Sequence, residues 1–334
     1  MTIESGYDAV PRSTCRVCAG ALARKWTLTV LDRHAAEYGE CRDCGSLQIV
    51  NPHWLAEAYR DEGKPVTVNP DTGRFLRNFS AYTRLRALEH AGLFGGPLRG
   101  LDYGGGSGLL AAMLRTAGRE CRQFDPYCPL PIFAPELAFQ TAADIPAGSF
   151  NAVVALEVFE HLLDPLDVIR TLAGALAPAG TIVLSTGLYE PGVHTEAWPY
   201  LSCPAGQHVT FYTRKAIRLL ADAAGLPTVC LFPSNDGFLI VLTHLDRSRA
   251  ARCFTRAARA LQNTSLLAEW TAGGWDIRHH TGATICPRPT FVDHAGAASS
   301  PGRPRNAERS PAVIGIRRSL RRLWRSFGGY PDEG

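Results

Sequence analysis

Apolar runs with the length of strands alternate with helical patterns through the middle of the chain. The strand-like runs are Leu98–Tyr103, Cys121–Asp125, Phe150–Leu156, Thr181–Thr186, Thr228–Phe232 and Gly237–Thr243, and the helical patterns are Gly108–Ala117, Pro165–Leu176 and Thr213–Ala224. This alternation predicts an α/β fold, a doubly wound and mostly parallel sheet with helices on both of its faces. No helical pattern separates the last two runs, so we expect them to pair as a hairpin that makes one edge antiparallel.

The flanks of this region have different patterns. Residues 53–95 are predicted to be mostly helical, because apolar side chains recur there at helical spacing. These side chains are Phe75, Phe79, Tyr82, Leu85 and Leu88. After Leu245 the periodicity fades. We expect a basic helix over Arg247–Leu261, a linker or disordered stretch over His294–Pro311 and a short basic amphipathic helix over Arg317–Phe327.

Composition narrows the class of protein. Hydrophobic residues make up 46% of the 334 positions and charged residues 20%, values typical of globular proteins and not of disordered, collagen-like or coiled-coil chains. The net charge is +4, but residues 301–334 hold eight arginines against three acidic residues, so the first 300 positions carry a net charge of −1. The basic character belongs to the C-terminal tail and gives no indication of the substrate.

Neither a membrane span nor a secretory signal is expected. No apolar run approaches the roughly 18 to 20 residues that a membrane helix needs. The first residues, Met1–Asp8, have neither a basic start nor an apolar stretch. We therefore expect a cytoplasmic protein, in which clustered cysteines bind metal more often than they form disulfides.

Four of the ten cysteines form two Cys-x-x-Cys pairs that are separated by 22 residues. Each pair can place two thiolates on one turn, and the two turns together predict a four-sulfur zinc site like that of zinc ribbons. Such a closed site has no position for a substrate, so we expect a structural metal. Redox-active thiols are the alternative, but the doubled motif lies in a short segment without a βαβ pattern. The expected ligands are Cys15, Cys18, Cys41 and Cys44.

A glycine-rich turn follows the first strand of the predicted sheet and opens its first helix. Glycines let the backbone turn tightly here and approach a ligand. The spacing Gly104-x-Gly106-x-Gly108 differs from the dinucleotide fingerprint, because Leu109 stands where the third dinucleotide glycine would fall. With Asp102 ahead of it, the turn resembles the first motif of class I S-adenosylmethionine-dependent methyltransferases, an acidic residue followed by Gly-x-Gly-x-Gly.

The resemblance continues in order along the chain. It implies a seven-stranded, Rossmann-like methyltransferase sheet that binds S-adenosylmethionine through Asp102 and the three glycines. It further implies that Asp125 accepts hydrogen bonds from the ribose hydroxyls and that Asp144 lies beside the adenine. A loop cap is the alternative for either aspartate. Residues 150–165 are similar to the family's fourth strand and the turn after it, where Glu157 is a further cofactor-binding candidate.

The N-terminal part bears a resemblance of its own. A four-cysteine knuckle followed by Asn51-Pro52 and a helix with Tyr59 is similar to the zinc-binding segment fused to some small-molecule O- and C-methyltransferases, including deoxysugar C-methyltransferases. The predicted organisation is a zinc knuckle over residues 1–52, a helical connector or lid over 53–96, the methyltransferase domain over 97–245 and a basic, partly disordered extension over 246–334.

Candidate catalytic residues lie beyond the carboxyl end of the fourth strand, where ligands of such sheets bind. If the turn there is helical, Glu157, Glu160 and His161 share one face. Their pattern, Glu-x-x-Glu-His, resembles the metal-binding motif of ubiquinone-biosynthesis O-methyltransferases and of small-RNA 3′-terminal 2′-O-methyltransferases. His208 stands in the region of a later histidine ligand of the RNA enzymes. The resemblance implies a Mg²⁺, Mn²⁺ or Zn²⁺ ion that lowers the pKa of substrate hydroxyls.

Metal-free alternatives are open for the same residues. Glu157 and His161 can line a pocket without metal, as similar residues do in metal-free relatives, or Glu157 can cap a helix. His208 is separately a general-base candidate or an anchor for the loop before the Thr213 helix. The long loop after the fifth strand carries aromatic and polar side chains that suit a substrate lid or a packed surface loop. These side chains are Tyr189, His194, Trp198 and Tyr200.

Three functions are compatible with these features. The first is methyl transfer to oxygen or carbon of a small-molecule acceptor. The second is metal-dependent RNA 2′-O-methylation with the Arg-rich tail on the phosphates, although no basic stripe crosses the predicted catalytic domain. The third is a non-catalytic zinc-ribbon protein that binds a partner. Loop side chains set the shape of an acceptor pocket, so the sequence identifies neither the acceptor nor the oligomeric state.

Overall fold

The computed structural model describes residues 13–59, 72–128, 131–133, 135–234, 237–263, 265–266 and 290–299. Every described residue lies in the first of the two units into which the chain divides, Met1–Pro301. The basic helix expected over Arg317–Phe327 and the arginines of the tail therefore lie outside the described residues. Among the described helices, none combines the length and the apolar character that crossing a bilayer requires.

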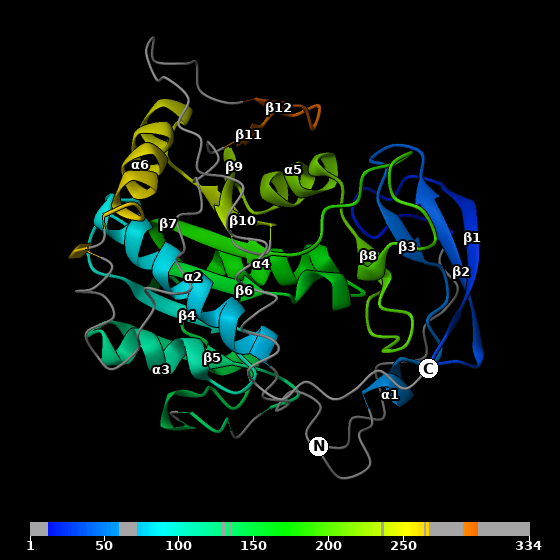
Figure 1. Cartoon of the computed structure of the whole chain (residues 1–334), viewed down its shortest axis with the longest axis horizontal. Helices are drawn as coiled ribbons and strands as arrows, with labels where there is room; N and C mark the ends of the chain where they lie inside the picture. Colours follow the sequence, from blue (N-terminus) through cyan, green and yellow to red (C-terminus); the bar gives the residue numbers. More distant parts are fainter. Residues whose placement is uncertain are drawn as a thin grey trace, which may run out of the picture. The chain divides into compact units, whose positions relative to one another are not determined.

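The larger of two sheets has eight strands in the order β12-β11-β9-β10-β7-β6-β4-β5 (Figure 1). Its parallel part contains β4 (Arg99–Tyr103), β5 (Glu120–Phe124), β6 (Phe150–Leu156) and β7 (Leu176–Ser185). Its antiparallel part contains β9 (Thr228–Ser234), β10 (Gly237–Thr243), β11 (Thr290–Val292) and β12 (Ala298–Ser299). The hairpin expected for the last two predicted strands is present as β9 and β10.

The predicted doubly wound, Rossmann-like sheet is confirmed. Of the seven strands that the methyltransferase resemblance implies, six are present. An isolated parallel bridge between Gln123 of β5 and Ala138 lies where the third is expected. The sheet also continues beyond the prediction. Residues 294–299, expected to be linker or disordered, form the turn and second strand of a hairpin whose first strand, β11, pairs with β9. Residue composition does not indicate this hairpin, because strands as short as β11 and β12 form only by pairing with an existing sheet edge, here that of β9.

Helices cover both faces of this sheet (Figure 1). One face carries α2 (Thr72–His90), α3 (Leu109–Thr116) and α6 (Arg247–Ala260), and the other carries α4 (Pro165–Ala175) and α5 (Arg214–Ala223). Each helix buries an apolar stripe, such as Ile169 and Leu172 in α4. The start of α5 is set by a capping residue: the Thr213 hydroxyl accepts a hydrogen bond from the Ala216 amide at 3.1 Å. The short 3-10 helices are η3 (Pro135–Leu137), η4 (Ala142–Asp144), η5 (Phe159–His161) and η6 (Pro199–Leu201).

The smaller, antiparallel sheet contains the N-terminal segment. Its order is β1 (Leu22–Val30), β2 (His34–Cys41), β3 (Leu47–Ile49) and β8 (Thr210–Phe211). The core of this sheet includes Trp54 and the first residue of α1 (Leu55–Ala58), both buried. Because β8 comes from the loop region after β7, the N-terminal segment completes its sheet with a strand of the predicted methyltransferase domain. The proposed domain boundaries stay predictions.

The chain order reverses between β4 and β6. The chain leaves β4 through α3 to reach β5 on one side, whereas β6 pairs with the other side of β4. In doubly wound sheets, ligands bind beyond the carboxyl ends of the strands at such a reversal. The carboxyl end of β4 leads into the glycine-rich turn and that of β6 leads into Glu157. The fold therefore brings two of the predicted site features to the same edge.

Candidate active site

The four predicted zinc ligands converge. All four sulfur atoms lie within 4.8 Å of one another, with Cys15 and Cys44 at 3.6 Å and Cys18 and Cys41 at 3.4 Å. A tetrahedral site with Zn–S bonds of about 2.3 Å separates its sulfurs by about 3.8 Å. All four cysteines are free rather than disulfide-bonded. The cluster therefore fits a zinc knuckle.

Polar side chains lie beside two of the knuckle sulfurs, those of Cys15 and Cys44. The side-chain amide of Gln48 donates to Cys15 Sγ at 2.9 Å. Ser46 Oγ lies 3.4 Å from Cys15 Sγ and 3.2 Å from Cys44 Sγ. The hydrogen bond between Cys15 and Cys44 lowers the pKa of Cys15 to about 4 and raises that of Cys44, so the thiolate of this pair lies on Cys15 and the proton on Cys44. Thiolates are the form that binds metal, so the donors around the sulfurs suit a bound cation.

The glycine-rich turn between β4 and α3 has a backbone that glycine adopts most readily. Gly104, Gly106 and Gly108 have positive φ angles of 73°, 53° and 82°. Space is lacking as well, because a Cβ on Gly108 would collide with the carbonyl oxygen of Phe133. The three glycines of the predicted cofactor motif are therefore required by the local conformation.

Asp125 holds this turn from the end of β5. One of its carboxylate oxygens accepts a hydrogen bond from the Gly106 amide at 2.9 Å. The other accepts from the amides of Tyr127 and Cys128 at 2.8 and 3.1 Å. The carboxylate thus joins the glycine-rich turn to the loop after β5, and its role in ribose binding stays a prediction.

Asp102 lies beneath the turn, inside the protein. Only 3% of its surface is exposed, and its Oδ2 makes no hydrogen bond with the described residues. A Cβ on Gly105 would lie 2.8 Å from that oxygen. Burial, with the nearby charge of Asp125 as the second cause, raises the pKa of Asp102 to about 7.

The raised pKa of Asp102 predicts a pH-dependent stability. The folded chain keeps a proton that the unfolded chain, with an ordinary pKa of 3.8, releases. The free energy of unfolding therefore falls as the pH rises from about 4 to about 7, by on the order of 4 kcal/mol. Asp102→Asn should lack this slope, so calorimetry should show its melting temperature rising relative to wild type over that range. Asp167→Asn, at a carboxylate that is 80% exposed, should follow wild type; a constant difference for Asp102→Asn would speak against the raised pKa.

Asp144 ends η4 and caps it. Its carboxylate accepts hydrogen bonds from the backbone amide and the hydroxyl of Thr141 at 2.8 and 2.9 Å, which forms a capping box. The residue is exposed. Of the two interpretations that the sequence allows, the loop cap is the one present here, and contact with adenine stays a prediction.

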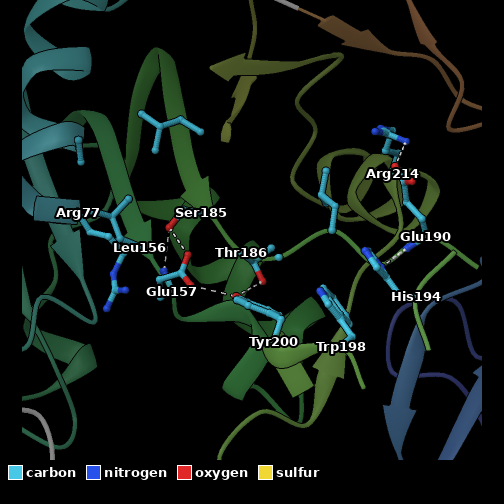
Figure 2. Close-up of a pocket in the computed structure, with 14 residues that line it drawn as sticks. Arg77, Leu156, Glu157, Ser185, Thr186, Glu190, His194, Trp198, Tyr200 and Arg214 are labelled. Atoms are coloured by element: carbon cyan, nitrogen blue, oxygen red, sulfur yellow. Dashed lines mark hydrogen bonds and ion pairs between the residues drawn. The ribbon is translucent and has the colours of Figure 1, made fainter. Parts of the chain in front are cut away.

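Glu157 follows β6 in a left-handed backbone conformation with a φ of 51°. Its carboxylate accepts hydrogen bonds from the hydroxyls of Ser185 and Tyr200 at 2.7 and 3.1 Å (Figure 2). The residue precedes η5, so it does not share the helical face expected for it with Glu160 and His161. Such a strained backbone at a non-glycine residue is typical of functional sites.

Glu160, His161 and His208 do come together. One potential ligand atom from each lies within 4.8 Å of the others. Glu160 is fully buried, and neither carboxylate oxygen accepts a hydrogen bond of normal geometry from the described residues. His161 Nε2 lies 3.9 Å from one of these oxygens. Burial, followed by the charge of Glu157, raises the pKa of Glu160 to about 8. A buried carboxylate with so few donors is costly alone, and a cation between these three side chains would offset that cost.

Backbone carbonyl groups orient both imidazoles. Nδ1 of His161 lies 3.1 Å from the carbonyl oxygen of Gln207, and Nδ1 of His208 lies 2.7 Å from that of Tyr200. A carbonyl oxygen can only accept, so each Nδ1 carries the proton and leaves the lone pair on Nε2. Burial lowers the pKa of His208, which favours the neutral imidazole that a metal requires. Such carbonyl support is typical of metal-ligating histidines.

A cavity of about 570 Å³ lies at the carboxyl ends of β6 and β7 (Figure 2). Glu157 and Tyr200 line it, and the ring of Tyr200 lies 4.8 Å from that of His208. Arg77 of α2 lines it too, as does Arg214, which pairs with Glu190 at 2.8 Å. The cavity therefore adjoins the histidine cluster and offers both charged and aromatic groups to an acceptor.

Three of the four lid candidates belong to this cavity. His194, Trp198 and Tyr200 line it, and the rings of His194 and Trp198 stack at 4.1 Å. Tyr189 is instead buried against the small sheet, where its hydroxyl donates to Glu40 of β2 at 2.6 Å. Motion of this loop as a lid stays a prediction.

Sequence reasoning missed the positions of Tyr59 and Arg77. Tyr59, which follows α1, stacks its ring on that of Tyr127 at 4.5 Å, and its hydroxyl lies 3.1 Å from His161 Nδ1. It therefore connects the loop after β5 to the histidine cluster. No local pattern marks either residue, because only the folded chain brings α1 and α2 to the strand ends.

Comparison with protein families identifies the domain that carries these features. Residues 71–231 match the sequence profile of the family described as "Methyltransferase domain". These residues are a methyltransferase domain. The match includes the glycine-rich turn, Asp125 and the cluster of Glu160, His161 and His208.

Curated relatives match parts of the chain, and solved structures align with it. Over 108 residues, the chain is 35% identical to a ubiquinone biosynthesis O-methyltransferase of Xanthomonas campestris pv. campestris, with 26% of this chain and 42% of that protein covered. Over 192 residues, it is 28% identical to the ubiquinone biosynthesis O-methyltransferase of Idiomarina loihiensis, with 46% and 73% covered. The chain thus spans about two fifths of the first relative's length. The solved 1,6-didemethyltoxoflavin-N1-methyltransferase of Burkholderia thailandensis aligns with 18% identity and a TM-score of 0.41, over 62% of this chain and 94% of that one.

Proposed function

We propose that the chain is an S-adenosylmethionine-dependent methyltransferase that acts on a hydroxyl group of a small molecule with the help of a divalent cation. The cluster of Glu160, His161 and His208 at the carboxyl end of β6 carries this proposal. The names of the two curated relatives, both O-methyltransferases, support oxygen as the acceptor atom. The cavity beside Tyr200 supports a small acceptor, because its volume matches that of ordinary ligand pockets.

We infer that the cofactor lies over the glycine-rich turn at the reversal of chain order. The turn brings the partly exposed backbone of Gly104 and Gly106 to the edge where ligands of such sheets bind, with Gly108 buried behind them. Asp125 holds the turn in this shape through the Gly106 amide. The ribose hydroxyls are the groups that we expect the same carboxylate to contact.

The substitution Gly108→Ala tests the proposed cofactor site. Alanine there needs a φ of 82° and brings its Cβ against the carbonyl oxygen of Phe133, so the turn must shift. We expect the affinity for S-adenosylhomocysteine in isothermal titration calorimetry to fall about tenfold or more. Gly118→Ala is the matched control, since its φ is 72° but no atom lies within 4 Å of the added Cβ. Equal affinities for both variants and wild type would exclude this placement, and a wild type that binds no S-adenosylhomocysteine would exclude the proposed activity.

Glu160, His161 and His208 are the residues that would hold the cation. One carboxylate oxygen and two imidazole nitrogens suit Zn²⁺ or Mn²⁺ better than Mg²⁺, which prefers oxygen ligands. Three protein ligands leave room for the substrate. A divalent cation bound there would lower the pKa of a hydroxyl that it contacts.

The chain's own residues would orient the acceptor and exclude water. The carboxylate of Glu157, fixed by Ser185 and Tyr200, faces the cavity and can accept a hydrogen bond from an acceptor hydroxyl. The stacked rings of Tyr59 and Tyr127 cover the space between the loop after β5 and His161. Alignment of the acceptor with the methyl donor is the main contribution that a protein makes to such a displacement.

We also propose that the four-cysteine cluster binds a structural Zn²⁺ ion. The sulfur separations and the hydrogen bond that Gln48 donates to Cys15 Sγ support this assignment. Free, closely spaced thiolates persist in reducing compartments, so the proposal includes the cytoplasmic location that the sequence predicts.

A further inference from the structure

Arg16 stands between the first two cysteines of the knuckle, yet its side chain lies inside the protein. It is 5% exposed. Its Nη2 donates to the carbonyl oxygen of Ile49 at 2.7 Å, and its Nη1 donates to that of Val209 at 3.2 Å. Its backbone amide donates to Gln48 Oε1 at 3.0 Å. Arginine is almost never so deeply buried unless its donors have partners, and here they reach two different segments of the chain.

Val209 follows His208, and its peptide groups are held from two sides. The Val209 amide donates to the carbonyl oxygen of Glu160 at 2.7 Å. The Val209 carbonyl oxygen accepts from Arg16 and from the Ile49 amide, the latter at 3.0 Å. Val209, the neighbour of His208, therefore connects the backbone of Glu160 to the cysteine knuckle.

Further bonds fasten the same stretch of chain to the knuckle. The Thr213 hydroxyl donates to the carbonyl oxygen of Cys44 at 2.6 Å, and Lys215 Nζ donates to that of Asp43 at 2.7 Å. Gln48 of β3 pairs with Thr210 of β8. Arg16 differs from these links because its guanidinium fork reaches both β3 and the residue beside His208.

We propose that Arg16 is a positioning residue that couples the two metal-binding clusters. It transmits the folded state of the cysteine knuckle to Val209 and so sets the separation of His208 from Glu160. This inference rests on the proposed function, which assigns a divalent cation to the second cluster. Metal–ligand distances must agree within a few tenths of an ångström, so a small displacement of Val209, and with it of the neighbouring His208, weakens binding. A planar fork with fixed donors can hold two carbonyl groups in one geometry, which a single ammonium group cannot.

The second Cys-x-x-Cys pair offers a matched control. Arg42 follows Cys41 as Arg16 follows Cys15, but Arg42 is exposed. We would titrate full-length chains that hold one zinc each with Mn²⁺ and follow binding by electron paramagnetic resonance. Arg16→Met should lower the Mn²⁺ affinity about tenfold or more, the size of effect typical of residues that orient metal ligands. Arg16→Lys should lie between that variant and wild type, and Arg42→Met should match wild type.

Hydrogen exchange supplies a readout that does not depend on Mn²⁺. The Val209 amide should exchange about tenfold faster or more in Arg16→Met than in wild type, and at the wild-type rate in Arg42→Met. Zinc-replete Arg16→Met with unchanged Mn²⁺ affinity would overturn the coupling alone. A wild-type chain that binds no Mn²⁺ would overturn the coupling together with the proposed cation site. Should Arg16→Met fail to fold, Arg16→Lys carries both measurements, and wild-type values for it in both would overturn the role of the fork.

Discussion

Replacing Glu160 by glutamine should abolish cation binding at the second cluster without harming the fold. We expect the Mn²⁺ affinity to fall about 100-fold or more, because the variant loses the only charged ligand among the three side chains. Release of S-adenosylhomocysteine in the presence of an acceptor should fall with it. The melting temperature of the metal-free chain should stay the same or rise at neutral pH, since a buried carboxyl group with a pKa of about 8 is already largely neutral there and a neutral glutamine amide costs no more to bury.

Glu157→Gln is the matched control for the metal measurement. Its carboxylate lies three positions earlier but is bonded to Ser185 and Tyr200 and does not belong to the cluster. The Mn²⁺ affinity of this variant should stay within about threefold of wild type, as for a residue that is not a ligand. Unchanged affinity in Glu160→Gln, or an equal loss in both variants, would rule out the assigned ligand set.

Loss of the knuckle should destabilise the methyltransferase domain as well as the N-terminal segment. Cys44→Ser removes one of the four sulfurs, so we expect the zinc content to fall to near zero and the melting temperature to fall by about 10 °C or more. The effect should extend to the methyltransferase domain, because β8 pairs with β3 and Thr213 bonds to the Cys44 carbonyl oxygen. Calorimetry and a colorimetric zinc-release assay measure the two quantities.

Cys253→Ser separates this effect from the general loss of a thiol. Cys253 is half-buried on α6 and lies outside the knuckle. Its replacement should leave the zinc content unchanged and the melting temperature within about 2 °C of wild type. A Cys44→Ser chain that keeps its zinc, or melts like Cys253→Ser, would show that the four sulfurs do not form one structural site.

The sequence predicted those helices and strands whose burial leaves a regular pattern of apolar residues along the chain. Strands such as Phe150–Leu156 are buried on both faces and appear as continuous apolar runs, while α5 shows a clear apolar stripe. Of the strands that escaped prediction, which also include β1, β2, β3 and β11, the shortest are β8 and β12, with two residues each. Their conformation depends on pairing with an edge that other parts of the chain supply, so no local pattern indicates them.

The same distinction applies to the candidate site, whose residues either stand in local motifs or are brought together only by the fold. The four cysteines, the three glycines and the Glu-His pair could be singled out as candidates from the sequence, because the proposed chemistry fixes their residue types and spacing. The contacts of Arg16 and Tyr59 were not found, because segments far apart in sequence create them. Glu157 departs from its expected place for a local reason: its positive φ carries the side chain toward Ser185 and away from η5.

Anomalous X-ray diffraction tests the proposed cation site most directly. The crystals would contain the full chain with S-adenosylhomocysteine, zinc and Mn²⁺. We predict a zinc peak among the four cysteine sulfurs and a manganese peak about 2.2 Å from a Glu160 carboxylate oxygen and from the Nε2 atoms of His161 and His208. A cofactor-bound crystal without an anomalous peak between these three side chains would contradict the proposed metal-assisted methyl transfer.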